Sequence, residues 1–199
     1  MGDGALLERA APRRRDADAT RAAILDAARL HFGRSGYDLA SLRDIAAEAG
    51  CDVALIKRYF GGKEGLFTQA LRASLHPERL RAWDRTTFPR DVAAMMAGSP
   101  HAAEAQTESF QFLLRAATSP TTAPLLNVVV QDRFMAPIRE WIGGADAGPR
   151  ARVLAASYIG FLVERLVRGE ALIGREREVF IDRVSAIFTA LVTEPDAPG

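Results

Sequence analysis

Two adjacent basic side chains, Lys57 and Arg58, carry the clearest chemical pattern in the chain. The segment around them has a helical period that places Ile56 and Phe60 on one side, and both basic residues with Ala54 on the other. Guanidinium and ammonium groups donate hydrogen bonds to O6 and N7 of guanine, and small apolar side chains contact the methyl group of thymine. The exposed side of this segment therefore has the chemistry of a helix that reads base edges in DNA.

A tight turn and another short helix are expected to position this segment. Ser41 can cap the first helix, and Gly50 can end it because glycine adopts the left-handed conformation of many helix C-caps. Asp52 can cap the second helix, where the period places Val53 on the buried side. A carboxylate is unfavourable near phosphates, so we interpret Asp52 as a cap and not as a reader of cytosine. Two short helices around a glycine turn are typical of a helix-turn-helix DNA reader.

The run from Arg21 to Leu71, about a quarter of the chain, resembles the N-terminal domain of TetR/AcrR-type transcriptional regulators. The matching pieces are Ile24-Leu25-Asp26-Ala27-Ala28, Gly36-Tyr37, Ser41-Leu42-Arg43-Asp44-Ile45-Ala46, Ala49-Gly50, Tyr59-Phe60 and Lys63-Glu64-Gly65-Leu66. The sequence departs from the family at Cys51, Asp52 and Lys57, where Val, Ser and Tyr are common. The resemblance implies an all-α fold in which a three-helix DNA-binding domain precedes a helical regulatory domain.

In the resembling family the third helix lies in the major groove, which implies a set of DNA contacts for this chain. The base-edge candidates are Arg43, Val53, Ala54, Lys57 and Arg58. The phosphate candidates are Ser41, Tyr59 and Lys63. One short reading helix covers too few base pairs for useful specificity, so we expect two copies on a palindromic site in double-stranded operator DNA.

Composition excludes several other classes of protein. Apolar residues make up 48% of the 199 residues, which excludes a disordered chain, and a single cysteine excludes an internal disulfide. The net charge of +1 argues against bulk electrostatic binding to nucleic acid, although a local basic patch would suffice. No apolar run reaches the length of about 18 residues that a membrane helix needs. We therefore expect a cytoplasmic protein with no membrane contact.

The chain is expected to have three parts and about nine helices in all. Residues 1–17 form a flexible basic tail, either a solvated terminus or an arm that reaches phosphates or an adjacent minor groove. Residues 18–62 form the helix-turn-helix domain, with a first helix that ends near Arg34. Residues 63–199 form a helical domain for ligand binding and dimerisation.

The last two expected helices, Arg150–Arg168 and Arg177–Val192, carry more apolar surface than one small domain can bury. The first has a stripe of small residues that would let another helix approach closely. We therefore expect a homodimer in which these helices of both chains form a four-helix bundle. The interface candidates are Val153, Ala156, Gly160, Val163, Phe180, Val184, Ile187 and Phe188.

Aromatic residues are frequent in the second half of the chain, and Pro137 interrupts a helical stripe there. Such a break could open space between helices for a small apolar effector. The first candidates for its binding site are Phe110, Phe134, Trp141 and Tyr158. The alternative is that these side chains form a plain packed core.

The favoured hypothesis is a sequence-specific DNA-binding regulator, a repressor that a small-molecule effector releases from its operator. One alternative is an effector-independent regulator or an activator with a closed core. The other is a helical enzyme, but no paired carboxylates, Ser/His/Asp set or Gly-rich phosphate loop support it. No cofactor and no metal are expected. Cys51 is interpreted as a small buried side chain, with a redox sensor as the alternative.

Overall fold

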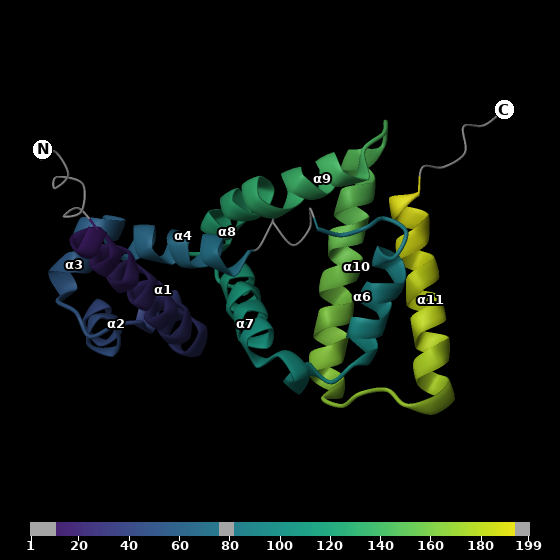
Figure 1. Cartoon of the computed structure of the whole chain (residues 1–199), viewed down its shortest axis with the longest axis horizontal. Coiled ribbons are helices and arrows are strands. Elements are labelled where there is room, and N and C mark those ends of the chain that lie inside the picture. Colours follow the sequence, from purple (N-terminus) through teal and green to yellow (C-terminus); the bar gives the residue numbers. More distant parts are fainter. Residues whose placement is uncertain (1–10, 76–81, 194–199) are drawn as a thin grey trace, which may run out of the picture. The chain divides into compact units, whose positions relative to one another are not determined.

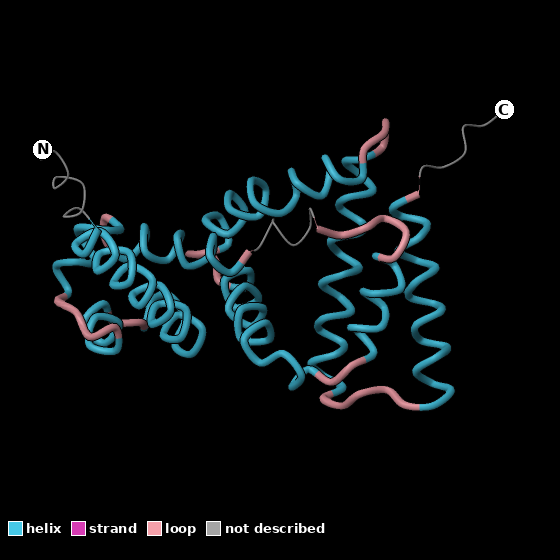
Figure 2. The backbone as a smooth tube through the Cα atoms, in the orientation of Figure 1, coloured by secondary structure: helices cyan, strands magenta, loops and turns pink. Residues whose placement is uncertain are grey.

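The computed structural model describes residues 11–75 and 82–193, and within them all side chains except those of residues 11–15 and 102–106. Every regular element in these ranges is a helix (Figure 1), and loops connect them (Figure 2). The helices are α1 (Ala11–Leu39), α2 (Leu42–Glu48), α3 (Val53–Phe60), α4 (Lys63–Ser74), α6 (Phe88–Ala97), η1 (Pro100–Ala103), α7 (Glu104–Thr118), α8 (Ala123–Val130), η2 (Gln131–Met135), α9 (Ala136–Ile142), α10 (Ala147–Arg168) and α11 (Gly174–Val192). The all-α expectation is confirmed. No helix of the described residues is long and apolar enough to cross a membrane.

The first helix differs from the expectation at both ends. It begins at Ala11, so residues 11–17, which were expected in a flexible tail, are helical. Residues 1–10 of the expected tail lie outside the described residues. The backbone leaves the helical region at Gly36, with φ of 76° and ψ of 172°, before the chain reaches Leu39. A glycine is needed there because other residues rarely adopt this positive φ.

Two compact units divide the chain, and the first combines Met1–Ser74 with Glu108–Leu126. Within this unit α1 packs against α2 and α4, and α3 packs against α2 and α4. The rings of Phe32, Phe67 and Phe112 are almost fully buried, and Phe112 comes from α7. The unit therefore extends beyond the expected boundary at residue 62, because α4 and much of α7 share its core.

The second unit combines Leu75–Thr107 with Asn127–Gly199. Its core lies where α6 packs against α10 and α11, and these three helices run side by side in Figure 1. Phe88, Met96 and Phe188 are fully buried in it. Arg165 of α10 is only 5% exposed, and its guanidinium donates to the carbonyl oxygens of Gly98 and Ser99 just after α6, which offsets the cost of burying it.

A widened turn, η2, joins α8 to α9 and stands where the sequence predicted a kink at Pro137. The backbone N–H of Ala136 donates to the carbonyl oxygen of Gln131, five residues earlier, which is the π-helical pattern. Pro137 has no N–H to donate and lies in the first turn of α9. The N–H groups of a first turn have no acceptor within their own helix, so a proline there costs no helical hydrogen bond.

Candidate nucleic-acid interface

Local hydrogen bonds fix the ends of α2 and the turn that follows it. The backbone N–H groups of Arg43 and Asp44 donate to Ser41 Oγ, at 3.2 and 3.4 Å. Gly50 has a φ of 64°, and its N–H donates to the carbonyl oxygen of Ala47. The N–H of Cys51 donates to the carbonyl oxygen of Ala46. This pair of bonds is a Schellman motif, which ends a helix and reverses the chain within a few residues. The expected helix, glycine turn and second helix are confirmed.

The next helix, α3, presents its basic face to solvent. Asp52 Oδ1 accepts a hydrogen bond of 2.7 Å from the N–H of Ala54, which confirms Asp52 as the N-cap. Ile56 and Phe60 are buried, while Lys57 and Arg58 are exposed.

The prediction that Val53 lies on the buried side of α3 is wrong, because its side chain is 40% exposed. Val53 is the first residue of α3, and the helical period indicates direction but does not show whether anything packs over the first turn. Its exposure leaves it beside Ala54 as a small apolar side chain that can contact a thymine methyl group.

A close approach between backbones sets the junction of α3 and α4. Gly61 ends α3 at φ of 77°, and its N–H donates to the carbonyl oxygen of Lys57. A Cβ atom added at Gly65 would lie 1.8 Å from the carbonyl oxygen of Phe60. Only a glycine at position 65 therefore allows α4 to pass so near the end of α3.

Lys63, the first residue of α4, is held by two contacts to the end of α1. Its Nζ donates to the carbonyl oxygen of Asp38 at 3.1 Å and lies 5.0 Å from the centroid of the Tyr37 ring. Partial burial, and then the nearby charges of Glu64 and Asp38, raise the pKa of the Tyr37 hydroxyl. The ring under the ammonium group is thus neutral at ordinary pH, and the contact is a cation–π interaction.

Arg21 belongs to the same region, although the sequence did not single it out. Its guanidinium carbon lies 5.2 Å from the centroid of the Phe60 ring, and the side chain is exposed. The contact joins α1 to the end of α3. No local sequence pattern indicates this contact, because it joins residues far apart in the chain.

The predicted DNA contacts therefore lie on three consecutive helices of the first unit. Ser41 and Arg43 lie at the start of α2, where Arg43 is exposed and Ser41 is half-buried. Val53, Ala54, Lys57, Arg58 and Tyr59 lie on α3, and Lys63 begins α4. The Tyr59 ring is half-buried and packs edge to face on Phe60 at 6.4 Å.

Cys51 is half-buried in the turn before α3. Burial, and then the neighbouring carboxylate of Asp52, raise the pKa of its thiol. A raised pKa lowers the thiolate fraction, so this site lacks the electrostatics of a reactive cysteine. Its place in the Schellman motif, next to Ala46, is that of a small apolar side chain.

The interface candidates fall into two groups. On α10 the small-residue stripe is exposed, with Val153 at 51% and Val163 at 36%, and Ala156 and Gly160 are exposed with them. On α11 Ile187 is 44% exposed and Phe180 is half-buried.

Val184 and Phe188 are buried in the core of their own chain, so they face α6 and α10 and are not available to another protomer. A single apolar stripe on α11 could not be divided from sequence into its core side and its outer side. Val184 and Phe188 therefore leave the set of interface candidates.

The four aromatic ligand candidates are not gathered at one cavity. Phe134, Trp141 and Tyr158 are half-buried against the core of the second unit, whereas Phe110 is half-buried in the part of α7 assigned to the first unit. Trp83 lies between two of them, with ring centroids 6.2 Å from Trp141 and 6.3 Å from Tyr158. Trp141 Nε1 also donates to the carbonyl oxygen of Trp83 at 3.2 Å.

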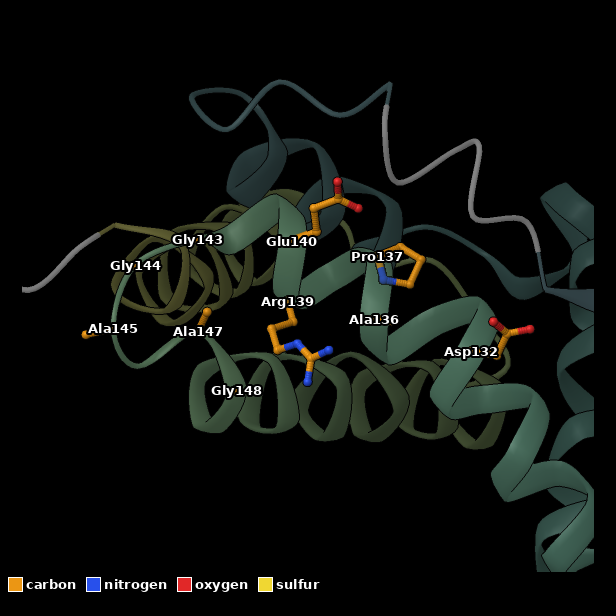
Figure 3. Close-up of a pocket in the computed structure, with 10 residues that line it drawn as sticks. All are labelled: Asp132, Ala136, Pro137, Arg139, Glu140, Gly143, Gly144, Ala145, Ala147 and Gly148. Carbon is orange, nitrogen blue, oxygen red and sulfur yellow. The ribbon is translucent and has the colours of Figure 1, made fainter.

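A surface hollow of about 590 Å³ does lie beside Pro137, between α9 and the start of α10 (Figure 3). Arg139 points from α9 toward the first turn of α10, near Gly148, while Glu140 points the other way. The hollow is lined by polar and small residues, and none of the four aromatic candidates is among them. It has a different chemical character from the apolar site that the sequence predicted.

Two family descriptions match the chain, one on each side of residue 75. Residues 24–70 match the bacterial regulatory proteins of the tetR family, and residues 86–192 match the tetracyclin repressor-like C-terminal domain. The second match alone covers more than half of the chain. The chain therefore belongs to the tetR family of bacterial regulatory proteins, which makes it a DNA-binding transcriptional regulator and not an enzyme.

Individual relatives agree with this assignment. The HTH-type transcriptional regulator BetI of Agrobacterium fabrum (strain C58 / ATCC 33970) is 28% identical over 163 residues, which cover 76% of this chain and 79% of BetI. The crystal structure of a transcriptional regulator from Aquifex aeolicus VF5 has a TM-score of 0.60 at 13% identity, over 86% of this chain and 99% of that one. NalD, the secondary repressor of the MexAB-OprM multidrug efflux pump in Pseudomonas aeruginosa, has a TM-score of 0.56 at 22% identity, over 85% and 95% of the two chains. At these identities the two structures show a shared fold.

Proposed function

We propose that the protein is a homodimeric repressor that binds a palindromic operator through α3 and is released from it by a small-molecule effector. The observation that carries the DNA-binding part is the exposed face of α3, with Lys57 and Arg58 beside Val53 and Ala54. Caps at both ends of α3 and the glycine contact with α4 hold this face in a defined orientation. A rigid helix with base-reading side chains is what direct readout in the major groove requires.

The dimer follows from the need for two reading helices and from the exposed side of α10. Apolar side chains on a monomer surface are normal singly, but a continuous stripe along a helix marks an interaction surface. Val153, Ala156, Gly160 and Val163 form such a stripe, and Val167, 83% exposed, continues it by one turn. The small side chains at its centre would allow the equivalent helix of a second protomer to pack closely, as an isologous interface requires.

The effector part of the proposal rests on the aromatic side chains of the second unit. Phe134, Trp141 and Tyr158 remain the candidates, and Trp83 joins them because its ring contacts two of them. An apolar ligand would bind by replacing some of these ring contacts with its own. Such a ligand weakens DNA binding only to the extent that it prefers the conformation that does not fit the operator.

Packing in the same cluster favours the second candidate function, an effector-independent regulator. The rings of Trp141 and Tyr158 both pack against Trp83, as side chains of a packed core do. Fluorescence distinguishes the two functions, since Trp83 and Trp141 are the two tryptophans of the chain. An effector that binds there changes their emission and releases operator DNA, whereas a closed core gives neither response over a panel of apolar compounds.

The DNA-binding proposal is tested by selecting random DNA fragments with the purified protein and sequencing the bound pool. The expected result is an enriched motif with two inverted half-sites whose centres lie about 34–36 Å apart or a multiple of that spacing. Two-fold symmetry of the motif reflects two-fold symmetry of the protein. A pool without a symmetric motif would count against the proposal.

A further inference from the structure

A small hollow of about 200 Å³ lies inside the first unit, beside a cluster of four rings. The rings of this four-ring cluster are Phe32, Tyr37, Phe67 and Phe112. Phe67 lies at its centre and meets each of the other three edge to face, at centroid distances of 5.0 to 5.4 Å. All four rings line the hollow, so one of its walls is aromatic.

The size and the walls of the hollow suit a single aromatic ring. A cavity of about 150 Å³ is large enough to bind benzene, so about 200 Å³ leaves room for one ring and a small substituent. Ala116, which is buried, adds a further apolar wall. Leu39 also lines the hollow although 82% of its surface is exposed, so a bound ring would cover an apolar side chain that now faces water.

Arg115 supplies a fixed positive charge at this hollow. Its Nη1 donates to the carbonyl oxygen of Arg34 at 3.0 Å, which anchors the guanidinium to the end of α1. A guanidinium has five N–H groups, so this bond leaves other donors for a carboxylate. None of the ion pairs in the described part of the chain includes Arg115.

The other polar groups of the hollow restrict where a ligand's charge can lie. The hydroxyl of Thr122 is buried and already donates to the carbonyl oxygen of Ala116 at 2.8 Å. Asp38 also lines the hollow, and its negative charge repels an anion. We therefore expect an anionic substituent on the Arg115 side of the hollow, whose lining also includes Ser119.

We propose that this hollow is a binding site for a small monocyclic aromatic carboxylate, of about the size of benzoate. Its ring would add to the edge-to-face contacts of the four-ring cluster, and its carboxylate would pair with Arg115. The site lies within the DNA-binding unit and is separate from the aromatic cluster around Trp83 in the second unit.

Occupancy of this site would reach the phosphate-contact region through Lys63. Tyr37 and Asp38 both line the hollow, and both contact Lys63. The Tyr37 ring lies under the Lys63 ammonium group, and the carbonyl oxygen of Asp38 accepts a hydrogen bond from it. A ligand that shifts either residue moves the ammonium group, and the added negative charge opposes the approach of phosphates. This consequence rests on the proposed DNA-binding function, and we expect benzoate to lower operator affinity, but the binding site itself does not depend on it.

The test is calorimetric titration of the full chain with three probes, benzoate, benzamide and benzylamine. We expect saturable binding of one benzoate per chain, with benzylamine weaker by about tenfold or more because it lacks the charge that pairs with Arg115. Tryptophan emission should stay constant during the titration, since Trp83 and Trp141 lie in the second unit. No saturable benzoate binding, or equal affinity for benzylamine, would overturn the proposal.

Two variants locate the bound molecule. Ala116→Leu fills the hollow and should abolish binding of benzoate and benzamide alike. Arg115→Gln should weaken benzoate by about tenfold and leave benzamide unchanged, because only the charged pair is lost. Arg139→Gln, at the hollow beside Pro137, is the matched control and should bind benzoate as the wild type does.

Far-ultraviolet circular dichroism and a thermal melt establish that each variant is folded. Arg115 is exposed, so its variant decides the matter alone if Ala116→Leu does not fold. Unchanged benzoate affinity in a folded Arg115→Gln would overturn the site. If the benzoate site is overturned in this way while the protein still selects a symmetric DNA motif, the proposed DNA-binding function is unaffected.

Discussion

At the scale of single residues, the positions of the candidate DNA-reading side chains could be predicted because they depend on local sequence. Asp52 caps the helix that begins one residue later, and Lys57 and Arg58 lie opposite a buried stripe. Val53 was misplaced because the period of a helix does not show what covers its first turn. The contacts that hold Arg21 and Lys63 were not predictable, since each joins residues far apart in the chain.

Lys63→Ala should weaken the binding of every DNA sequence to a similar extent, because a phosphate contact carries no sequence information. The slope of log affinity against log salt concentration should decrease in magnitude by about one unit. Binding titrations at several salt concentrations, with operator and with unrelated DNA, measure both effects. A loss confined to the operator would assign Lys63 to base recognition and contradict its role as a phosphate contact.

At the scale of elements, the glycines of the run 61–65 decide how α3 meets α4. The helices themselves follow from local pattern, but their mutual distance follows from a contact between the backbone of Phe60 and Gly65, which no local pattern reveals. Local pattern was also insufficient on α11, where Val184 and Phe188 were predicted at the dimer interface and lie in the core of the chain. A stripe predicts that a face is covered and does not predict by what.

Gly65→Ala should lower the free energy of unfolding by about 3 kcal/mol or more, because the new Cβ atom cannot fit beside the carbonyl oxygen of Phe60 without moving the backbone. For a chain of this size the midpoint of thermal unfolding should fall by about 6 °C or more. Gly148→Ala is the matched control, since a Cβ atom there meets nothing within 4 Å. A melt of Gly65→Ala equal to that of the wild type would contradict the close approach.

At the scale of the whole molecule, recognition of an operator requires two copies of the reading helix, and the exposed stripe on α10 is where the copies would meet. The sequence predicted a stripe of small residues on α10, and the structure places this stripe on the outer side of the single chain, with Val153 exposed and Leu154 buried. The aromatic candidates were less predictable. A set of aromatic residues spread over α7 to α10 is as compatible with a packed core as with a ligand pocket.

Gly160→Arg should convert the dimer to monomers that bind the operator weakly. A Cβ atom added at the exposed position 160 meets nothing within 4 Å in the single chain, so the substitution should leave the protomer intact and block only a closely packed partner helix. Analytical ultracentrifugation at micromolar concentration measures the state of assembly. Ala145→Arg, in the exposed turn before α10, is the control and should remain dimeric.

A wild-type protein that sediments as a monomer at that concentration would contradict the proposed dimer. So would a dimeric Gly160→Arg variant, because an arginine at the centre of the stripe cannot be accommodated between two closely packed helices.

The most direct test of the central claim, that α3 reads the operator, is the affinity of the Lys57→Ala, Arg58→Ala double variant for the selected motif. Each side chain is exposed, so the variant should fold and dimerise normally, and each is expected to contribute about 1–3 kcal/mol to operator binding. Fluorescence anisotropy with labelled operator should therefore show a loss of affinity of about 30-fold or more. The control variant Arg90→Ala, on α6, should bind the operator as the wild type does. Unchanged operator affinity in a folded, dimeric double variant would contradict the assignment of α3 as the reading helix.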